Sequence, residues 1–214
     1  RRRQISRRGG AASALPHQGR MMVFEICRGV PEPARSHAVS LYWGAFGGKL
    51  SRVLGPDQQG LRFVDRVLDR DHALSALHGE ELIGVIGYRS VQGGFVYGTQ
   101  GDLRAVYGRF GAFWRGLCFA WLARDIENRA FMVDGIVVRE EWRGKGVGAA
   151  LIDAVCDKAR RKGYSHVRLD VVARNTRARA LYTRMGFEVT RERRSLITAM
   201  MFGFRRVLVM ERRL

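Results

Sequence analysis

Hydrophobic residues alternate with polar ones in several short stretches of the chain and recur every three or four residues in longer stretches. The first pattern predicts β-strands and the second predicts α-helices. Gly55 and Pro56 separate two helical stretches, and the turn His78-Gly79-Glu80 separates two alternating ones. In chain order, the first part of the chain therefore predicts a strand at 22–28, helices at 34–54 and 57–68, and strands at 72–77 and 81–88.

An aromatic segment follows a glycine-rich link, and its spacing predicts a helix over residues 102–124. Because most aromatic side chains in a globular protein are buried, we expect this helix to lie mostly in the core, with one face lining a pocket. The aromatic residues are Tyr107, Phe110, Phe113, Trp114, Phe119 and Trp121.

The last third of the chain alternates strand and helix patterns around a glycine-rich turn at 143–148, without an internal repeat. We therefore expect one α/β (α+β) domain over residues 21–214. Residues 1–20 are rich in Arg and lack hydrophobic periodicity, which predicts a disordered leader, or sequence upstream of the natural start. The remaining elements are strands at 130–138 and 165–172, helices from the turn to 162 and at 176–185, and strand-like pieces at 187–191 and 205–211.

Composition narrows the class of protein. With 214 residues of which 46% are hydrophobic, the chain has enough apolar material for a buried core, which excludes a fibrous or mostly disordered protein. No apolar stretch approaches the roughly 18 residues of a membrane span. The three Cys and five His match no metal-binding spacing. We expect a soluble, cytoplasmic protein with buried thiols, no metal and no membrane partner.

The net charge of +18 is unevenly distributed. Residues 1–20 contain six Arg and no acidic residue, residues 21–133 are almost neutral, and residues 134–214 contain 19 basic and 9 acidic residues. Such a surplus raises the possibility of nucleic-acid binding. Its position at the leader and the C-terminal part favours a basic surface, including Arg160, Arg161, Arg193 and Arg194, over a dedicated nucleic-acid site.

The turn at 143–148 lies between a strand and a helix, and this arrangement is typical of anion-binding sites. Glycines let backbone N–H groups converge on one point, and the helix N-terminus adds unpaired N–H groups and partial positive charge. The turn lacks the Ser or Thr after Lys145 that a Walker A motif requires. It also lies too far from the preceding strand, and too late in the chain, for a dinucleotide-binding fingerprint.

The motif R-x-x-G-x-G/A does match, through Arg143, Gly146 and Gly148. A second motif, N-x-x-A-x-x-L-Y-x-x-x-G-F, matches residues 175–187, one helix and one strand later. With these two motifs in this order, the chain resembles the GCN5-related N-acetyltransferase (GNAT) superfamily over residues 129–190, and the order of elements in 22–128 is similar as well. The resemblance implies a mixed, twisted central sheet with helices on both faces and two neighbouring parallel strands that splay apart.

It also implies that acetyl-CoA binds between these two strands as the co-substrate. The pantetheine arm would lie along Ile136–Val138, backbone N–H groups near Val137 and Val138 would stabilise the thioester oxygen, and the pyrophosphate would lie on the glycine-rich turn. The implied cofactor-binding residues are Ile136, Val137, Val138, Arg143, Gly144, Lys145, Gly146, Val147, Gly148, Ala149, Asn175, Ala178 and Tyr182.

The resemblance implies that Tyr182 protonates the departing CoA thiolate, although its helical spacing also suits a core aromatic residue. An amine acceptor must lose a proton before it attacks, and Asp134 is the favoured base, with Glu81 or a water relay as alternatives. Asn175 is also a natural helix N-cap, and Gly186 a natural helix end. A bulge near Asp134 would change the face on which its side chain lies.

The acceptor is expected to be a small-molecule amine, because its binding region is rich in aromatic residues. That region comprises Tyr42, Trp43, Phe46, Phe95, Tyr97, Tyr107, Trp114 and the link at 200–204. A homodimer is possible, and nucleic acid is not favoured as a partner. The alternative is a non-catalytic protein with the same fold that senses acyl-CoA or binds nucleic acid through its basic residues.

Overall fold

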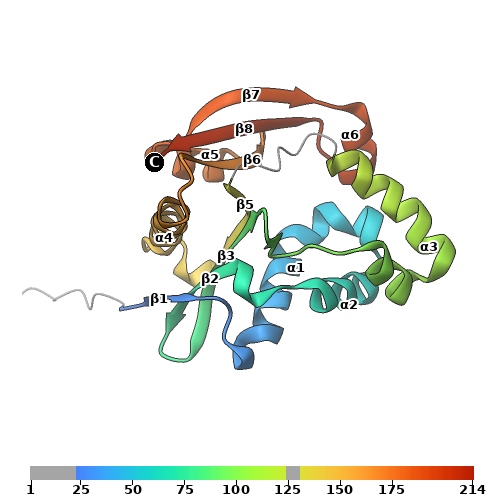
Figure 1. Cartoon of the computed structure of the whole chain (residues 1–214), viewed down its shortest axis with the longest axis horizontal. Coiled ribbons are helices and arrows are strands. Elements are labelled where there is room, and N and C mark those ends of the chain that lie inside the picture. The colour runs from blue at the N-terminus through green and yellow to red at the C-terminus, as the bar shows by residue number, and fades with distance from the viewer. Residues whose placement is uncertain (1–22, 124–130) are drawn as a thin grey trace, which may run out of the picture.

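A computed structural model describes residues 23–123 and 131–214. Seven strands form one continuous sheet in the order β1-β2-β3-β5-β6-β8-β7, and the short strand β4 pairs with β3 (Figure 1). The strands are β1 (Glu25–Arg28), β2 (Ala73–His78), β3 (Glu81–Ser90), β4 (Gly93–Gly94), β5 (Phe131–Val138), β6 (His166–Val172), β7 (Glu188–Arg194) and β8 (Arg206–Arg213). The α-helices are α1 (Arg35–Leu54), α2 (Asp57–Val67), α3 (Gln100–Ala123), α4 (Val147–Arg161), α5 (Thr176–Arg184) and α6 (Leu196–Phe202).

Strands β5 and β6 form a parallel pair and separate after three residue pairs. Their pairing runs from Phe131 opposite Val167 to Val133 opposite Leu169. Beyond this point β5 remains paired with β3, and β6 remains paired with β8. The two strands therefore splay apart at their C-terminal ends, which confirms the mixed sheet with a splayed parallel pair.

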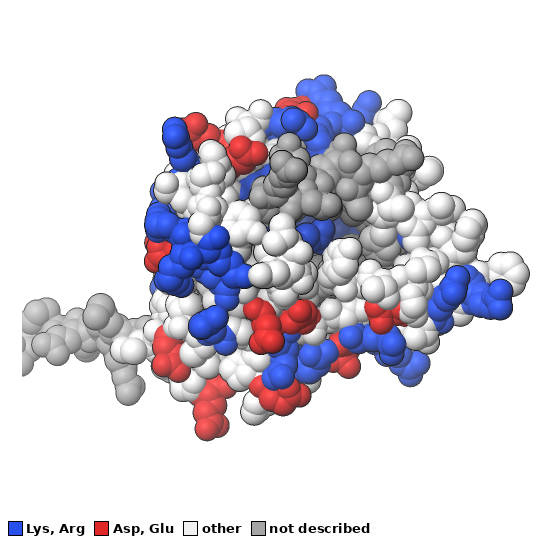
Figure 2. Space-filling view, in the orientation of Figure 1, with Lys and Arg blue, Asp and Glu red and all other residues white. Residues whose placement is uncertain are grey.

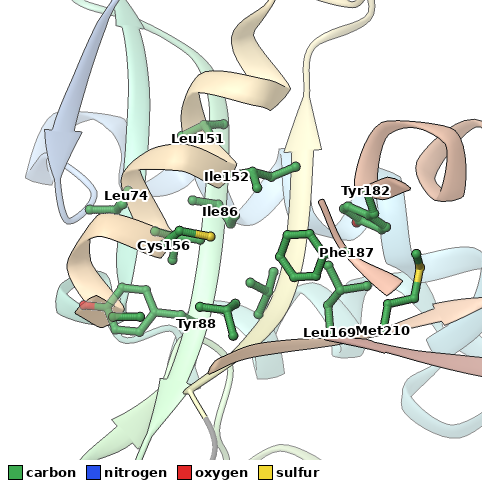
Figure 3. Packing of buried hydrophobic residues seen from close by; sticks show 14 of the residues in the cluster. Leu74, Ile86, Tyr88, Leu151, Ile152, Cys156, Leu169, Tyr182, Phe187 and Met210 are labelled. Atoms are coloured by element: carbon green, nitrogen blue, oxygen red, sulfur yellow. The ribbon is translucent and has the colours of Figure 1, made fainter. Parts of the chain in front are cut away.

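Helices cover both faces of the sheet, as predicted. On one face, α4 and α5 pack on side chains of β3, β5, β6 and β8, and Figure 3 shows Leu151, Ile152 and Cys156 of α4 directed toward the sheet. On the other face, α1 and α2 pack on a second apolar cluster around Trp43, Phe63 and Phe95. Ile136 and Val138 pack with the first cluster and Val137 with the second, as alternation along a strand requires.

A β-bulge interrupts β5 at Asp134. Gly135 lies opposite Gly87 and Val133 lies opposite Tyr88, so Asp134 has no partner residue in the ladder. A bulge places an extra residue on one strand and redirects its side chain. Asp134 contacts Arg89 and approaches Gly94 on β4, which places its carboxylate away from the α4 face.

Two predictions about helices are wrong. The expected link at 200–204 overlaps a helix, α6, which the sequence did not predict and whose N-cap Ser195 accepts a hydrogen bond from the Thr198 N–H. The aromatic segment is two helices that meet at Gly108, whose φ of 68° is not helical. In the second helix, Phe110, Phe113 and Trp114 are exposed instead of buried. They lie on the side of the helix that faces away from the core, whereas Ala112 on the other side is buried.

The other predicted elements agree with the structure to within a few residues at their ends. The leader at 1–20 lies outside the described residues, as do residues 21–22 and the predicted ends at residues 124 and 130. Cys156 is buried, whereas Cys27 and Cys118 are only partly buried, and all three thiols are free. Among the described helices, none is long and apolar enough to cross a membrane.

Candidate functional site

A pocket of about 480 Å³ opens where β5 and β6 separate. The splayed end of β5 and the start of α4 form one side, and α5 forms the other. Eleven of the thirteen predicted cofactor-binding residues line it: Ile136, Val137, Val138, Arg143, Gly144, Gly146, Gly148, Ala149, Asn175, Ala178 and Tyr182.

The N-terminus of α4 is open toward this pocket. Its N-cap residue, Gly146, has a left-handed backbone (φ 84°) and provides no side chain to cap the first turn. Gly144 is also left-handed (φ 79°), a conformation that glycine adopts without steric cost. The backbone N–H groups at the start of α4 are therefore available to an anion, and the helix dipole favours negative charge there.

The free edge of β5 offers backbone hydrogen-bonding groups to the same pocket. The Arg139 N–H donates to the Ile83 carbonyl on β3, and backbone groups of successive strand residues point in opposite directions. The N–H and carbonyl of Val138 therefore point away from β3, into the gap beside β6. The Arg143 side chain donates to this carbonyl from the gap side at 3.2 Å, which agrees with that orientation.

Tyr182 lies on α5, where it belongs to the core and also lines the pocket. The residue is 7% exposed and packs against Phe187, with ring centroids 6.1 Å apart (Figure 3). Burial raises the pKa of Tyr182 to about 12, so the hydroxyl stays protonated at neutral pH. Within the described part of the chain, the Tyr182 hydroxyl has no hydrogen-bond partner.

Asn175 and Gly186 delimit the helix that carries Tyr182. The Asn175 side chain accepts a hydrogen bond from the Ala178 N–H at 3.2 Å, which confirms its role as N-cap. Gly186, with φ 80°, follows the last turn in the left-handed conformation. Because Asn175 also lines the pocket, capping the helix and contacting a ligand are compatible roles for its side chain.

Asp134 lies in a buried polar cluster on the α1 side of β5. Its carboxylate is 3.2 Å from the Arg89 guanidinium, and its side chain is 8% exposed. Burial raises the pKa of Asp134, while the charge of Arg89 opposes that shift. The Asp134 Oδ2 atom and the Arg89 Nε atom are both buried without a hydrogen-bond partner. Such unpaired atoms are costly in a folded protein and are common where a ligand completes the site.

Aromatic side chains surround Asp134. Tyr42 lies near both Asp134 and Arg89, and burial raises its pKa well above the ordinary range. Its ring packs against Phe46 and Phe95, and Phe46 in turn covers Gly135, where a Cβ atom would lie 2.7 Å from the Phe46 ring. The Arg89 guanidinium lies over the Tyr97 ring.

Two of the other aromatic residues predicted to contact an acceptor, Trp43 and Tyr107, serve the packing of the helices. Trp43 lies between α1 and α2, where a Cβ on Gly60 would lie 2.0 Å from its ring. The Tyr107 hydroxyl donates to the Leu54 carbonyl, and the Arg115 guanidinium lies over the rings of Tyr107 and Trp114. Aromatic composition alone does not distinguish these packing roles from a ligand-contacting one.

Asp134 does not line the pocket, and three further predicted site residues lie outside its lining as well. The Lys145 ammonium is 5.3 Å from the centre of the Trp142 ring, outside the pocket lining. The Val147 side chain is buried in the core, so only its backbone remains near the open helix end. Glu81 forms an ion pair with Arg139 and is half exposed, which leaves Asp134 as the buried carboxylate beside the splayed strands.

Sequence reasoning missed several residues that line the pocket. Arg177, Leu181, Arg184 and Met185 come from α5, and Ala45 comes from α1. The α5 residues fall within the second motif, so their helical spacing relative to Ala178 was an available signal. Among the described residues, no group of three or more His, Cys, Asp or Glu could hold a metal ion.

The chain matches the Acetyltransferase (GNAT) family over residues 38–187. It is 39% identical over 69 residues to the mycothiol acetyltransferase of Jonesia denitrificans, a match that covers 32% of this chain and 22% of that protein. It is 38% identical over 60 residues to the thialysine N-epsilon-acetyltransferase of Bos taurus, covering 28% of this chain and 35% of that protein. These matches thus span only about a fifth to a third of the relatives' lengths.

The fold resembles that of an agmatine N-acetyltransferase variant, with a TM-score of 0.56 and 14% identity over 89% of this chain and 99% of that one. The family match at residues 38–187 includes the point where β5 and β6 splay apart and the open N-terminus of α4. It also includes both sequence motifs, the second of which ends at residue 187. The chain therefore belongs to the GNAT acetyltransferase family.

Proposed function

We propose that the chain transfers an acetyl group from acetyl-CoA to a primary amine of a small molecule. The observation that carries the proposal is the pocket at the splayed strands, which combines an uncapped helix N-terminus with a free strand edge. A diphosphate suits the first of these features, and the amide groups of a pantetheine arm suit the second. Arg143 adds positive charge beside the turn.

In this proposal the acceptor amine approaches from the opposite side, where Asp134 lies among aromatic rings. A primary amine is mostly protonated at neutral pH and must lose a proton before it can attack. Asp134 is suited to accept that proton, because a carboxylate with a raised pKa is a stronger base at neutral pH than an exposed one. Its unpaired Oδ2 atom is a suitable acceptor for the N–H of an amine.

The chemical step then forms one bond and breaks one bond. The amine nitrogen attacks the thioester carbonyl, and the Val138 N–H at the free edge of β5 stabilises the charge on the carbonyl oxygen. The carbon–sulfur bond breaks, the nitrogen gives up its remaining extra proton to solvent, and the Tyr182 hydroxyl protonates the departing thiolate. Tyr182 then regains a proton from solvent and Asp134 releases the proton that it took from the amine, so both groups are restored and one proton is released per turnover. The products are an N-acetyl amide and CoA.

The names of the matched relatives support an amine acceptor of low molecular mass, since thialysine is a small amine. The aromatic rings near Asp134 favour a partly apolar acceptor over an extended protein tail.

The test is thiol release from acetyl-CoA in the presence of a panel of primary amines. We expect at least one small amine to stimulate thiol release with formation of its N-acetyl product. Tyr182→Phe should lower kcat by about tenfold to a hundredfold with little change in acetyl-CoA affinity, because the variant loses a proton donor and keeps the pocket. Acetyl-CoA binding without turnover on any amine would favour the non-catalytic acyl-CoA sensor instead.

A further inference from the structure

Exposed large hydrophobic side chains are concentrated on two helices. Of the eleven in the described residues, seven lie on α3 and α6. On α3 they are Phe110, Phe113, Trp114 and Leu117, with exposed fractions of 93%, 65%, 42% and 57%, and on α6 they are Leu196, Ile197 and Met200, with 69%, 40% and 75%. Monomeric proteins rarely expose such a set together, and its presence indicates an interaction surface.

The four residues on α3 form one stripe. They follow the helical spacing i, i+3, i+4 and i+7, whereas Ala112, on the opposite side, is fully buried. The left-handed backbone of Gly108 separates this part of α3 from the preceding turns, which pack on α2. The stripe is therefore a face of a folded helix that is anchored by its other side.

The helices α3 and α6 are neighbours, so their exposed residues belong to one end of the molecule. The rings of Phe119 on α3 and Phe202 on α6 are 6.5 Å apart, and Arg52 of α1 donates hydrogen bonds to the Ala199 and Met200 carbonyls of α6. Figure 2 shows this end, at the right of the molecule, as a largely white surface with basic residues at its tip.

Charge identifies the kind of partner that suits this surface. The sequence contains no acidic residue between Asp102 and Asp125, where four Arg lie, and two of these, Arg104 and Arg109, are exposed on α3. A second copy of the chain on this surface would bring arginines against arginines. An anionic partner would instead meet both the apolar stripe and its basic border with complementary chemistry.

We propose that the outward face of α3 and α6 binds the surface of an anionic lipid bilayer. Phe, Trp and Leu side chains would enter the boundary between headgroups and acyl chains, and Arg109 beside the stripe would meet lipid phosphates. No continuous apolar stretch marks this surface in the sequence, because it is assembled from two helices that are far apart in the chain. The proposal does not depend on which amine is acetylated.

The experiment uses the full chain with vesicles of phosphatidylcholine, alone or with 30% phosphatidylglycerol, some of them with brominated acyl chains. We expect the chain to sediment with the anionic vesicles and its tryptophan fluorescence to be quenched by the bromine atoms. Quenching separates insertion from simple attraction of the Arg-rich residues 1–20, because those residues contain no Trp. Trp114 is within the proposed surface.

The double variant Phe110→Ser/Phe113→Ser should reduce bromine quenching and the affinity for anionic vesicles at least tenfold. A second double variant on the other helix, Leu196→Ser/Met200→Ser, should also reduce both quantities. Val91→Ser, a substitution at an exposed residue outside α3 and α6, is the matched control and should leave both unchanged. Thermal unfolding identifies any variant that fails to fold. Sedimentation with vesicles without bromine quenching would overturn the proposal. So would a chain that is a dimer in solution and becomes a monomer on substitution of Phe110 and Phe113, while its vesicle binding stays unchanged.

Discussion

At the scale of single residues, the chemistry of the site depends on how a carboxylate and a phenol are buried. Burial raises the pKa of Asp134 and the positive charge of Arg89 lowers it. Tyr182 has no such neighbour, and burial alone raises its pKa to about 12. The two groups therefore differ in the way that the proposed acid and base require, because Tyr182 keeps its proton and Arg89 favours the negative charge of Asp134.

Arg89→Met tests this arrangement. Removing the guanidinium leaves the desolvation of Asp134 unopposed, so its pKa rises and the carboxylate is protonated over more of the acidic range. The acidic limb of the kcat/KM profile should move to higher pH, and the ratio of activity at pH 6 to activity at pH 8 should fall about fivefold or more.

Arg66→Met is the matched control, because Arg66 pairs with Asp102 on the surface. That variant should keep the original profile. An unchanged acidic limb in the Arg89 variant would exclude Asp134 as the group that limits activity at low pH.

At the scale of elements, the start of α4 and the splayed end of β5 do the binding in the proposed function. The helix begins at a glycine without a side-chain cap, and the strand loses its β6 partner after Val133. The first N–H groups of α4 and the free edge of β5 therefore lack backbone partners, and both lie at the same pocket. A ligand that satisfies both sets offsets the cost of leaving them unpaired.

Gly146→Ala measures this contribution. At φ 84° an Ala side chain is strained, and the variant should lose about 1 kcal/mol of unfolding free energy. Gly163→Ala provides a control of equal strain, since Gly163 has φ 80°, has no atom near its Cβ position and lies beyond the opposite end of α4.

Both variants should show a similar loss of stability in urea, whereas acetyl-CoA affinity measured by calorimetry should fall about tenfold only in the Gly146 variant. Equal affinities in the two variants would remove the helix N-terminus from the binding site.

At the scale of the whole molecule, the proposed ligand would join the two parts of the sheet. Strands β1 to β5 lie on one side of the splay and β6 to β8 on the other, and the pocket is lined from β5, α4 and α5. Acetyl-CoA at a hundred times its Kd should therefore stabilise the fold by about 2.7 kcal/mol and raise Tm by roughly 5–10 °C. ATP at the same concentration is the control, and an equal rise with ATP would mean that the pocket recognises polyphosphates only.

The net charge also has a different meaning in the folded molecule. Several arginines expected on an open basic surface are paired, Arg160 with Asp157, Arg193 with Asp170, and Arg194 and Arg206 with Glu192. The pKa of Glu192 is about 2 because both arginines donate hydrogen bonds to it. Part of the charge surplus is therefore organised in ion pairs, and this weakens the argument for a nucleic-acid partner.

The sequence by itself determined most of the elements and the glycine-rich turn before α4, because these depend on local spacing. Alternation placed most strands, and the motif around Arg143 and Gly146 identified the start of α4. Tertiary structure decided which elements lie side by side. It brought Asp134, Arg89 and Tyr42 together from three distant segments, and it left the stripe at Phe110 exposed although its composition predicted burial. Spacing along the chain sets which side chains share a face, whereas only the packing of other elements determines whether that face is covered.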